Sequence, residues 1–137
     1  YLPLEVTEAL LSLGDTHAAQ GDGEVCGTAI ESPMIVSCKI DVLKGEKTRY
    51  PKLETNGPVI SHFDVKGYQV TTGIGEDLMQ AARDAVSGMI DWVAKSTDMS
   101  SVDAYMLCSV CGDLRISEIV DVPNWTVSFY FPKIVLD

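Results

Sequence analysis

The chain has 137 residues, 46% of them hydrophobic, and a formal net charge of −10 at pH 7. This length and composition predict a single folded domain over residues 1–137 rather than a disordered chain. The acidic balance argues against nucleic acid and against anionic membrane surfaces as partners, because both are bound by clusters of Lys and Arg. No apolar run approaches the roughly 20 residues that span a bilayer, and no signal peptide is visible.

The first part of the chain alternates in the manner of β-strands. Residues 2–13 place apolar side chains between polar ones and lead into a turn at Gly14. Alternation returns over residues 25–43, where Pro33 divides two strand candidates. Residues 44–47 are predicted to be a solvated turn of mixed charge.

Two further strands are predicted over residues 59–63 and 68–72, joined by a hairpin turn at 64–67. His62 lies in the first of them. A lone His in such a run is more typical of a core or surface residue than of a metal ligand, and the ligand role is the alternative.

The period then changes from two residues to about 3.6. Apolar residues recur at helical spacing from Leu78 to Val93, which predicts a long helix with a broad apolar stripe for packing on a sheet. Glu76 and Asp77 are expected in its first turn and Lys95 near its last, where their charges complement the helix dipole.

Ser100 is predicted to cap a second, shorter helix that ends near Cys111. Strand candidates follow over residues 115–120 and 126–131. Strands outnumber helices, and the helices lie late in the chain. We therefore predict an α+β fold that is rich in β structure, with sandwich-like sheets and one long and one shorter helix toward the C-terminus.

The four cysteines all adjoin apolar residues and are interpreted as reduced core residues of a cytoplasmic protein: Cys26, Cys38, Cys108 and Cys111. The spacing of the last two also suits a redox or zinc site. However, this pair falls at the end of the predicted helix, where the dipole disfavours a thiolate, and no second close pair accompanies it.

The richest chemistry lies in residues 14–24, which hold three carboxylates, one imidazole and three glycines. A cation between the acids would relieve their mutual repulsion and give the imidazole a partner. Oxygen and nitrogen donors together suit zinc or another divalent ion, calcium included. The predicted ligands are Asp15, His17, Asp22 and Glu24. The alternative is a polar turn in which Asp15 and Asp22 accept hydrogen bonds from backbone amides.

Residues 14–31, which read Gly-Asp-Thr-His-Ala-Ala-Gln-Gly-Asp-Gly-Glu-Val-Cys-Gly-Thr-Ala-Ile-Glu, closely resemble the signature of the acetamidase/formamidase family. A second stretch supports the resemblance: residues 103–110, then 113–121, then Pro123 and Asn124. Members of that family are metal-dependent hydrolases of short linear amides. They are also considerably longer, so the resemblance covers this whole chain but implies an N-terminal part that the sequence lacks.

The resemblance implies that a cation-activated water attacks a short amide and releases a carboxylate and ammonia. Glu24 is the first candidate for the general base, Asp22 the second, and Glu31 a weaker one; both Glu24 and Asp22 could equally be ligands. Gln20 could bind the substrate amide or stabilise the loop. The competing interpretation is a non-catalytic domain that binds a cation but needs the N-terminal part for activity.

Asp113, Arg115 and Glu118 are charged residues in an otherwise apolar stretch. They are interpreted as an internal ion pair, with a place in the active-site wall or in a subunit contact as the alternative. The resemblance, together with an apolar face where the N-terminal part would pack, implies either a homo-oligomer or association with that part.

Overall fold

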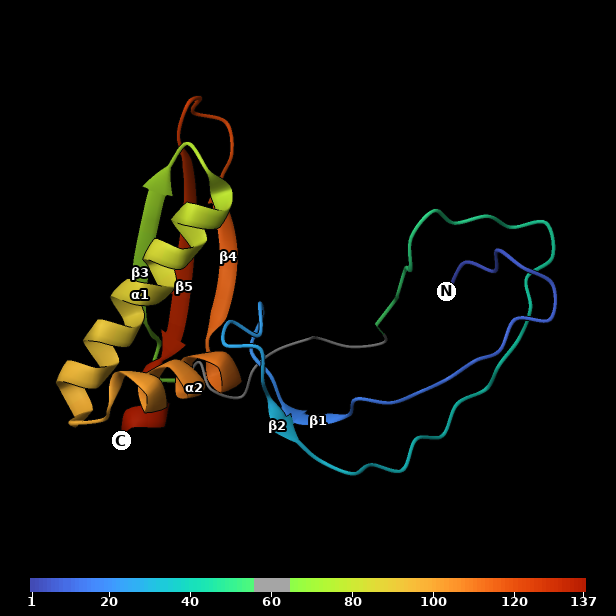
Figure 1. The fold of residues 1–137 in the computed structure, drawn as a ribbon, viewed down its shortest axis with the longest axis horizontal. Coiled ribbons are helices and arrows are strands. Elements are labelled where there is room, and N and C mark those ends of the chain that lie inside the picture. The colour runs from blue at the N-terminus through green and yellow to red at the C-terminus, as the bar shows by residue number, and fades with distance from the viewer. Residues whose placement is uncertain (56–64) are drawn as a thin grey trace.

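The computed structural model describes residues 1–55 and 65–137 (Figure 1). Its regular elements are two helices, five strands and a terminal turn of 3₁₀ helix: β1 (His17–Ala19), β2 (Ile30–Glu31), β3 (Tyr68–Gly75), α1 (Leu78–Thr97), α2 (Ser101–Cys111), β4 (Asp113–Glu118), β5 (Trp125–Pro132) and η1 (Lys133–Leu136). The predicted α+β class is confirmed. Within the described residues, neither helix combines the length and the apolarity that a membrane span needs.

The larger sheet is antiparallel and has the order β3-β5-β4. Its central strand β5 places Val127, Phe129 and Phe131 on one face, and all three are almost completely buried. Each such side chain contributes about 1.5–3 kcal/mol when it leaves water, so this face anchors the core. The face is covered by α1, while β1 and β2 form a separate two-stranded sheet.

Helix α1 covers the sheet because its smallest and most apolar residues recur every four positions. Ala81, Ala85, Met89 and Val93 are all fully buried, as the sequence period predicts. The helix begins after both of the acids expected in its first turn. Asp77 is the N-cap and accepts a hydrogen bond from the Gln80 amide at 2.7 Å, so the expectation that Glu76 and Asp77 lie in the first turn is wrong.

One glycine allows the helix to approach β3 closely. A Cβ atom built on Gly73 would lie 1.9 Å from the carbonyl oxygen of Ala81 in α1. No side chain fits at that distance, so the glycine at this strand position reflects helix–sheet packing.

Helix α2 follows directly, and its start has the predicted cap. The Ser100 hydroxyl accepts a hydrogen bond from the Asp103 amide at 3.1 Å, and the Asp103 carboxylate accepts one from that hydroxyl at 2.6 Å. The predicted strands at 68–72, 115–120 and 126–131 correspond to β3, β4 and β5 with small changes in their ends. The strand predicted at 59–63, with His62, lies outside the described residues.

The predicted strands over 2–13 and 25–43 are mostly wrong. Residues 1–14 and 32–55, here called the extended arms, contain no strand, and the β structure nearby is limited to β1 and β2. The arms run away from the sheet and meet where Tyr1 and Lys52 exchange backbone hydrogen bonds of 2.7 and 3.0 Å (Figure 1). An alternating segment forms a strand only where another backbone segment can pair with it. Among the described residues, strand pairing near the arms is limited to β1 with β2.

The cysteines differ in burial, and Cys26, which lies between β1 and β2, is only partly buried and does not belong to the core cluster. Cys108 is fully buried in the core and Cys111 packs beside it, so the interpretation of this pair as core residues is confirmed. Burial raises the pKa of each of these two thiols to about 12. Cys38 lies on an extended arm and is exposed, so its assignment to the core is wrong.

Candidate metal centre

The pairing of β1 with β2 brings together donor groups that are far apart in the sequence. The two strands are antiparallel, with His17 opposite Glu31 and an irregularity in register before Ala19. Thr16 and Ser32 extend the contact, because the Ser32 amide donates to the Thr16 carbonyl at 3.1 Å and the Thr16 hydroxyl donates to the Ser32 carbonyl at 2.6 Å. The side chains of His17 and Glu31 therefore share one edge of this small sheet.

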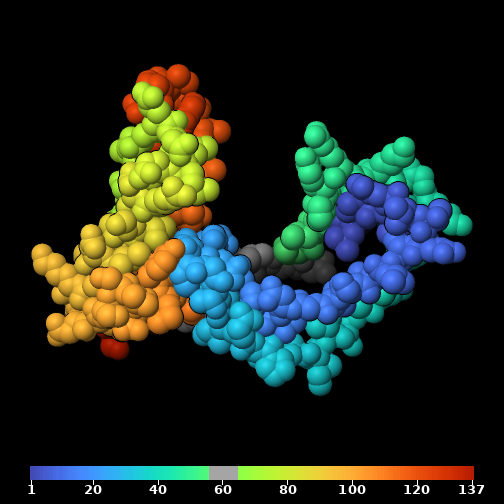
Figure 2. Space-filling model, in the orientation of Figure 1, coloured from blue at the N-terminus to red at the C-terminus, as the bar shows by residue number. Residues whose placement is uncertain are grey.

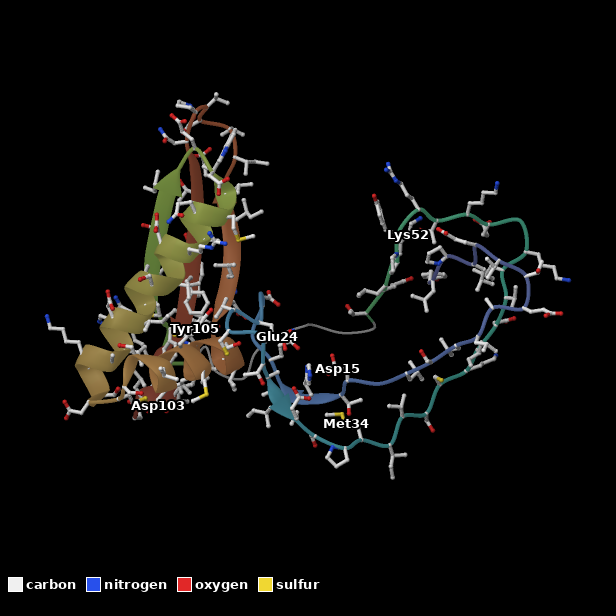
Figure 3. The ribbon with its side chains drawn as sticks, in the orientation of Figure 1. Asp15, Glu24, Met34, Lys52, Asp103 and Tyr105 are labelled. Carbon is white, nitrogen blue, oxygen red and sulfur yellow. The ribbon has the colours of Figure 1, made fainter. Side chains whose placement is uncertain are left out.

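A third donor comes from the residue before the strand. Asp15 has a φ angle of 57°, which is in the left-handed region that few residues other than glycine adopt. This turn of the backbone lies directly before β1, where Figure 3 labels Asp15. The Asp15 carboxylate lies within hydrogen-bond distance of the His17 ring. Strained backbone of this kind is often retained where a side chain must be aimed.

The three side chains converge on one nitrogen. His17 Nε2 lies 3.1 Å from Oδ1 of Asp15 and 3.2 Å from Oε2 of Glu31. One ligand atom from each residue lies within 4.8 Å of the other two, and within residues 1–55 and 65–137 no other set of three or more such groups converges in this way. The His17 side chain is 12% exposed, whereas the carboxylates of Asp15 and Glu31 are 85% and 63% exposed. The cluster is therefore open to solvent on its acidic side.

The second ring nitrogen of His17 has a partner of its own. Nδ1 lies 2.7 Å from Oε1 of Gln20, which can only accept. Nδ1 therefore carries the proton, and Nε2 faces the carboxylates either as a second N–H group or with a free lone pair. A metal-bound imidazole has the second arrangement, with its far nitrogen donating to an oxygen.

These neighbours raise the pKa of His17 above its usual value near 6.5. The hydrogen bond from Nδ1 to Gln20 contributes most. Partial burial acts in the opposite direction, and the negative charges of Glu31 and Asp15 then raise the pKa further.

The residues fit a divalent cation. One imidazole nitrogen and two carboxylate oxygens are a donor set that zinc accepts, and three protein ligands leave a position for water. Calcium fits less well, because it takes six to eight oxygen ligands and this cluster includes a nitrogen.

The structure brings together Asp15 and His17 of the predicted ligands but not Asp22 or Glu24. Those two lie on the loop of residues 20–29 that connects β1 to β2. The Asp22 amide donates to Oδ1 of Asp113 at 3.1 Å, and its carbonyl accepts from the Leu114 amide at 3.0 Å. Figure 3 shows Glu24 on the side of the loop nearer the larger sheet and Asp15 at the start of β1.

Glu31 takes the place in the cluster that spacing alone assigned to an acid nearer to His17. On sequence grounds it is only a weaker candidate for the base, because it lies seven residues past Glu24, along the strand that follows. The pairing of β1 with β2, opposite a turn rich in glycine, is the signal that could have identified it.

Residues 113 and 114, in the second sequence motif, form hydrogen bonds to the loop of residues 20–29. The interpreted ion pair is present, with Arg115 Nη2 3.4 Å from Oδ2 of Asp113, and the guanidinium lies over the Tyr130 ring at 4.5 Å. The Asp113 carboxylate also accepts a hydrogen bond from the Asp22 amide, so the two sequence motifs are in contact at Asp113. Figure 2 shows the loop lying against the surface of α2.

An apolar groove of about 340 Å³ opens beside the loop, between α1 and Leu114. Its lining includes Gly23, Val25 and Tyr105, but none of the three converging donors. The groove and the donor cluster are therefore separate features of the surface.

The model of the acetamidase/formamidase family matches residues 1–137, and the chain belongs to that family.

Two curated relatives match the whole chain. It is 28% identical over 153 residues to "Putative formamidase C869.04" of Schizosaccharomyces pombe and 27% identical over 152 residues to a formamidase of Methylophilus methylotrophus. The chain spans 37% and 36% of their lengths, respectively. Among solved structures, a gamma lactamase from Delftia acidovorans matches with a TM-score of 0.48 and 25% identity, over 57% of this chain and 21% of that one.

Proposed function

We propose that this chain takes part in the hydrolysis of short linear amides, of the formamide and acetamide type, at a divalent cation held by Asp15, His17 and Glu31. The observation that carries the proposal is the convergence of two carboxylates on His17 Nε2, with Nδ1 held by Gln20. Membership of the acetamidase/formamidase family supplies the class of substrate.

Hydrolysis of an amide requires activation of both the carbonyl carbon and the attacking water. The carbonyl carbon of an amide is a poor electrophile, and neutral water is a poor nucleophile. A bound divalent cation lowers the pKa of its water to about 7 and polarises the carbonyl oxygen. The protein must then accept a proton from that water and return one to the departing ammonia.

Glu24 remains our first candidate for this proton transfer, and Asp22 our second. Both lie on the loop of residues 20–29, which joins the strand that carries His17 to the strand that carries Glu31. Glu24 is partly buried and has a φ angle of 42°, so its position is constrained by the turn. Gln20 has a partner in His17, and we propose that it orients the imidazole rather than the substrate.

The test is release of ammonia from formamide and acetamide, measured on chelated protein and again after addition of Zn²⁺, Mn²⁺ or Ca²⁺. We expect activity that disappears with chelation and returns with zinc, together with a His17→Ala variant that neither binds zinc nor turns over. A Glu46→Gln variant, which changes an exposed acid on an extended arm, is the matched control and should behave as the parent does. Activity that survives exhaustive chelation would remove the metal mechanism.

A second candidate function is an incomplete site that binds the cation but needs another segment for turnover. Two observations favour it: the chain spans little more than a third of its curated relatives, and the extended arms expose many large apolar side chains. Activity that appears only when the N-terminal part of a relative is supplied would support it. Light scattering with and without that part would decide between this association and the homo-oligomer that the family resemblance implies.

A further inference from the structure

We infer that Ser109 is a positioning residue that keeps the loop of residues 20–29 in register with the donor cluster. This inference rests on the proposed function, because it concerns the same cation site. Ser109 lies in the last turn of α2, is fully buried and makes no hydrogen bond to any of the three donors. Its influence therefore passes through the loop.

One side chain makes two bonds to this loop. The Ser109 hydroxyl accepts a hydrogen bond from the Cys26 amide at 3.1 Å and donates one to the Thr28 carbonyl at 2.8 Å. The Ser109 carbonyl accepts a third bond, from the Gly21 amide at 3.1 Å. These contacts bracket residues 21–28, which include both candidates for the general base.

The hydroxyl is suited to this position because it both donates and accepts. The Ser109→Ala substitution would leave the Cys26 amide and the Thr28 carbonyl, which are partly buried, without their partner, and unpaired backbone groups in such a place are unfavourable. The loop would then have to move to find other partners.

The strands beside the loop cannot hold it alone. β1 has three residues and β2 has two, and an isolated two-stranded pair is at best marginally stable in water. His17 and Glu31 face each other only while these strands pair, so an anchor on the connecting loop also governs the distance between the donors. Tyr105 reinforces the anchor by donating its hydroxyl hydrogen to the Val25 carbonyl.

The experiment compares Ser109→Ala with Ser128→Ala. Ser128 is also buried, and its hydroxyl accepts one hydrogen bond from the Ser117 hydroxyl at 2.7 Å, but it lies in β5 and its side chain makes no hydrogen bond to the loop. We would measure thermal unfolding, amide hydrogen exchange, and Zn²⁺ affinity by competition with a chromophoric chelator. Both variants should unfold at lower temperature than the parent. Only Ser109→Ala should speed exchange at the Gly21 and Cys26 amides, by about tenfold or more, and weaken zinc binding by about tenfold.

The inference fails if folded Ser109→Ala keeps parental exchange at the Cys26 amide, or if Ser128→Ala weakens zinc binding as much. If Ser109→Ala does not fold, Ser109→Cys retains the volume with a weaker donor, and parental exchange at the Cys26 amide in that variant overturns the inference. If the parent binds no zinc, the proposed cation site fails. Faster exchange in Ser109→Ala would then still support the anchor, and unchanged exchange would reject it.

Discussion

Nδ1 of His17 lies 2.7 Å from Oε1 of Gln20, and this pair determines which ring nitrogen is left for the two carboxylates. We expect Gln20→Ala to weaken zinc binding by about 10–100-fold, as the loss of an outer partner of a ligating histidine commonly does. Equilibrium dialysis at fixed pH measures it. Gln20→Glu retains an acceptor at that place and should recover most of the affinity; equal losses in the two variants would contradict this role.

Glu31 and Glu24 should separate binding from turnover. Glu31→Gln removes a charged donor from the cluster, so we expect zinc content to fall with activity. Glu24→Gln should leave zinc content near the parental value and reduce turnover by about 10²–10⁴-fold, the usual range for a lost general base. Metal analysis and ammonia release on the same samples measure both. The reverse pattern would make Glu24 a ligand.

The His17 pKa predicts a pH dependence of stability in cation-free protein. Because the folded pKa is raised, the protonated ring stabilises the fold fully below pH 6.5, and this contribution is lost as pH rises through the folded pKa. We would measure the free energy of unfolding by urea in the presence of chelator. The parent should be more stable than His17→Ala at pH 6, and this difference in free energy should narrow as the pH rises to 9.

Zinc affinity should have the opposite trend, because Nε2 must lose its proton to bind the ion. Zinc titrations over the same pH range measure it. A stability gap that widened with pH, or an affinity that fell, would contradict the assignment of this nitrogen as the donor.

Two glycines of β3 offer a matched test of helix–sheet packing. Gly73→Ala should lower the free energy of unfolding by about 1–3 kcal/mol, since its Cβ would overlap the Ala81 carbonyl. Gly75→Ala meets nothing within 4 Å and should be neutral or stabilise by about 0.4–1 kcal/mol. Urea unfolding of both variants measures this difference. Similar losses in the free energy of unfolding would show that α1 does not pack on β3 at Gly73 as described.

The cysteines should react at different rates. A pKa of about 12 leaves roughly one thiol in 10⁴ ionised at pH 8, so Cys108 and Cys111 should resist N-ethylmaleimide in the folded chain. Cys38 is exposed and should be modified first. Peptide mass spectrometry over time measures the order, with Cys38→Ser as the control that loses the fast reaction. Rapid labelling of Cys108 would contradict its burial.

The second half of the chain was predictable because its signals are local. The four-residue spacing of Ala81, Ala85, Met89 and Val93 and the Ser100 cap depend only on near neighbours in sequence, and both are found in the structure. The extended arms show the limit of such signals. Alternation reports that a segment suits a strand, but a strand also needs a partner to pair with.

Only part of the donor cluster was predictable, because local sequence patterns do not report which segments pair with one another. Asp15 and His17 are two residues apart, so a single turn brings them together. Glu31 joins them through strand pairing across a loop, which the local spacing of acids does not report. Positive φ angles at Gly23 and Glu24 turn the chain between the two strands. Asp22 and Glu24 are therefore close to His17 in sequence but lie outside the cluster.

The loop and its anchors are separated by long stretches of chain. The bond from the Asp22 amide to Asp113 spans 91 residues, and that from the Cys26 amide to Ser109 spans 83. Contacts of such separation close large loops and form late, after local helices and turns. On a ribosome, residues 15–31 emerge well before α2 and β4, so we expect the nascent hairpin to remain unfinished until those two elements have been made.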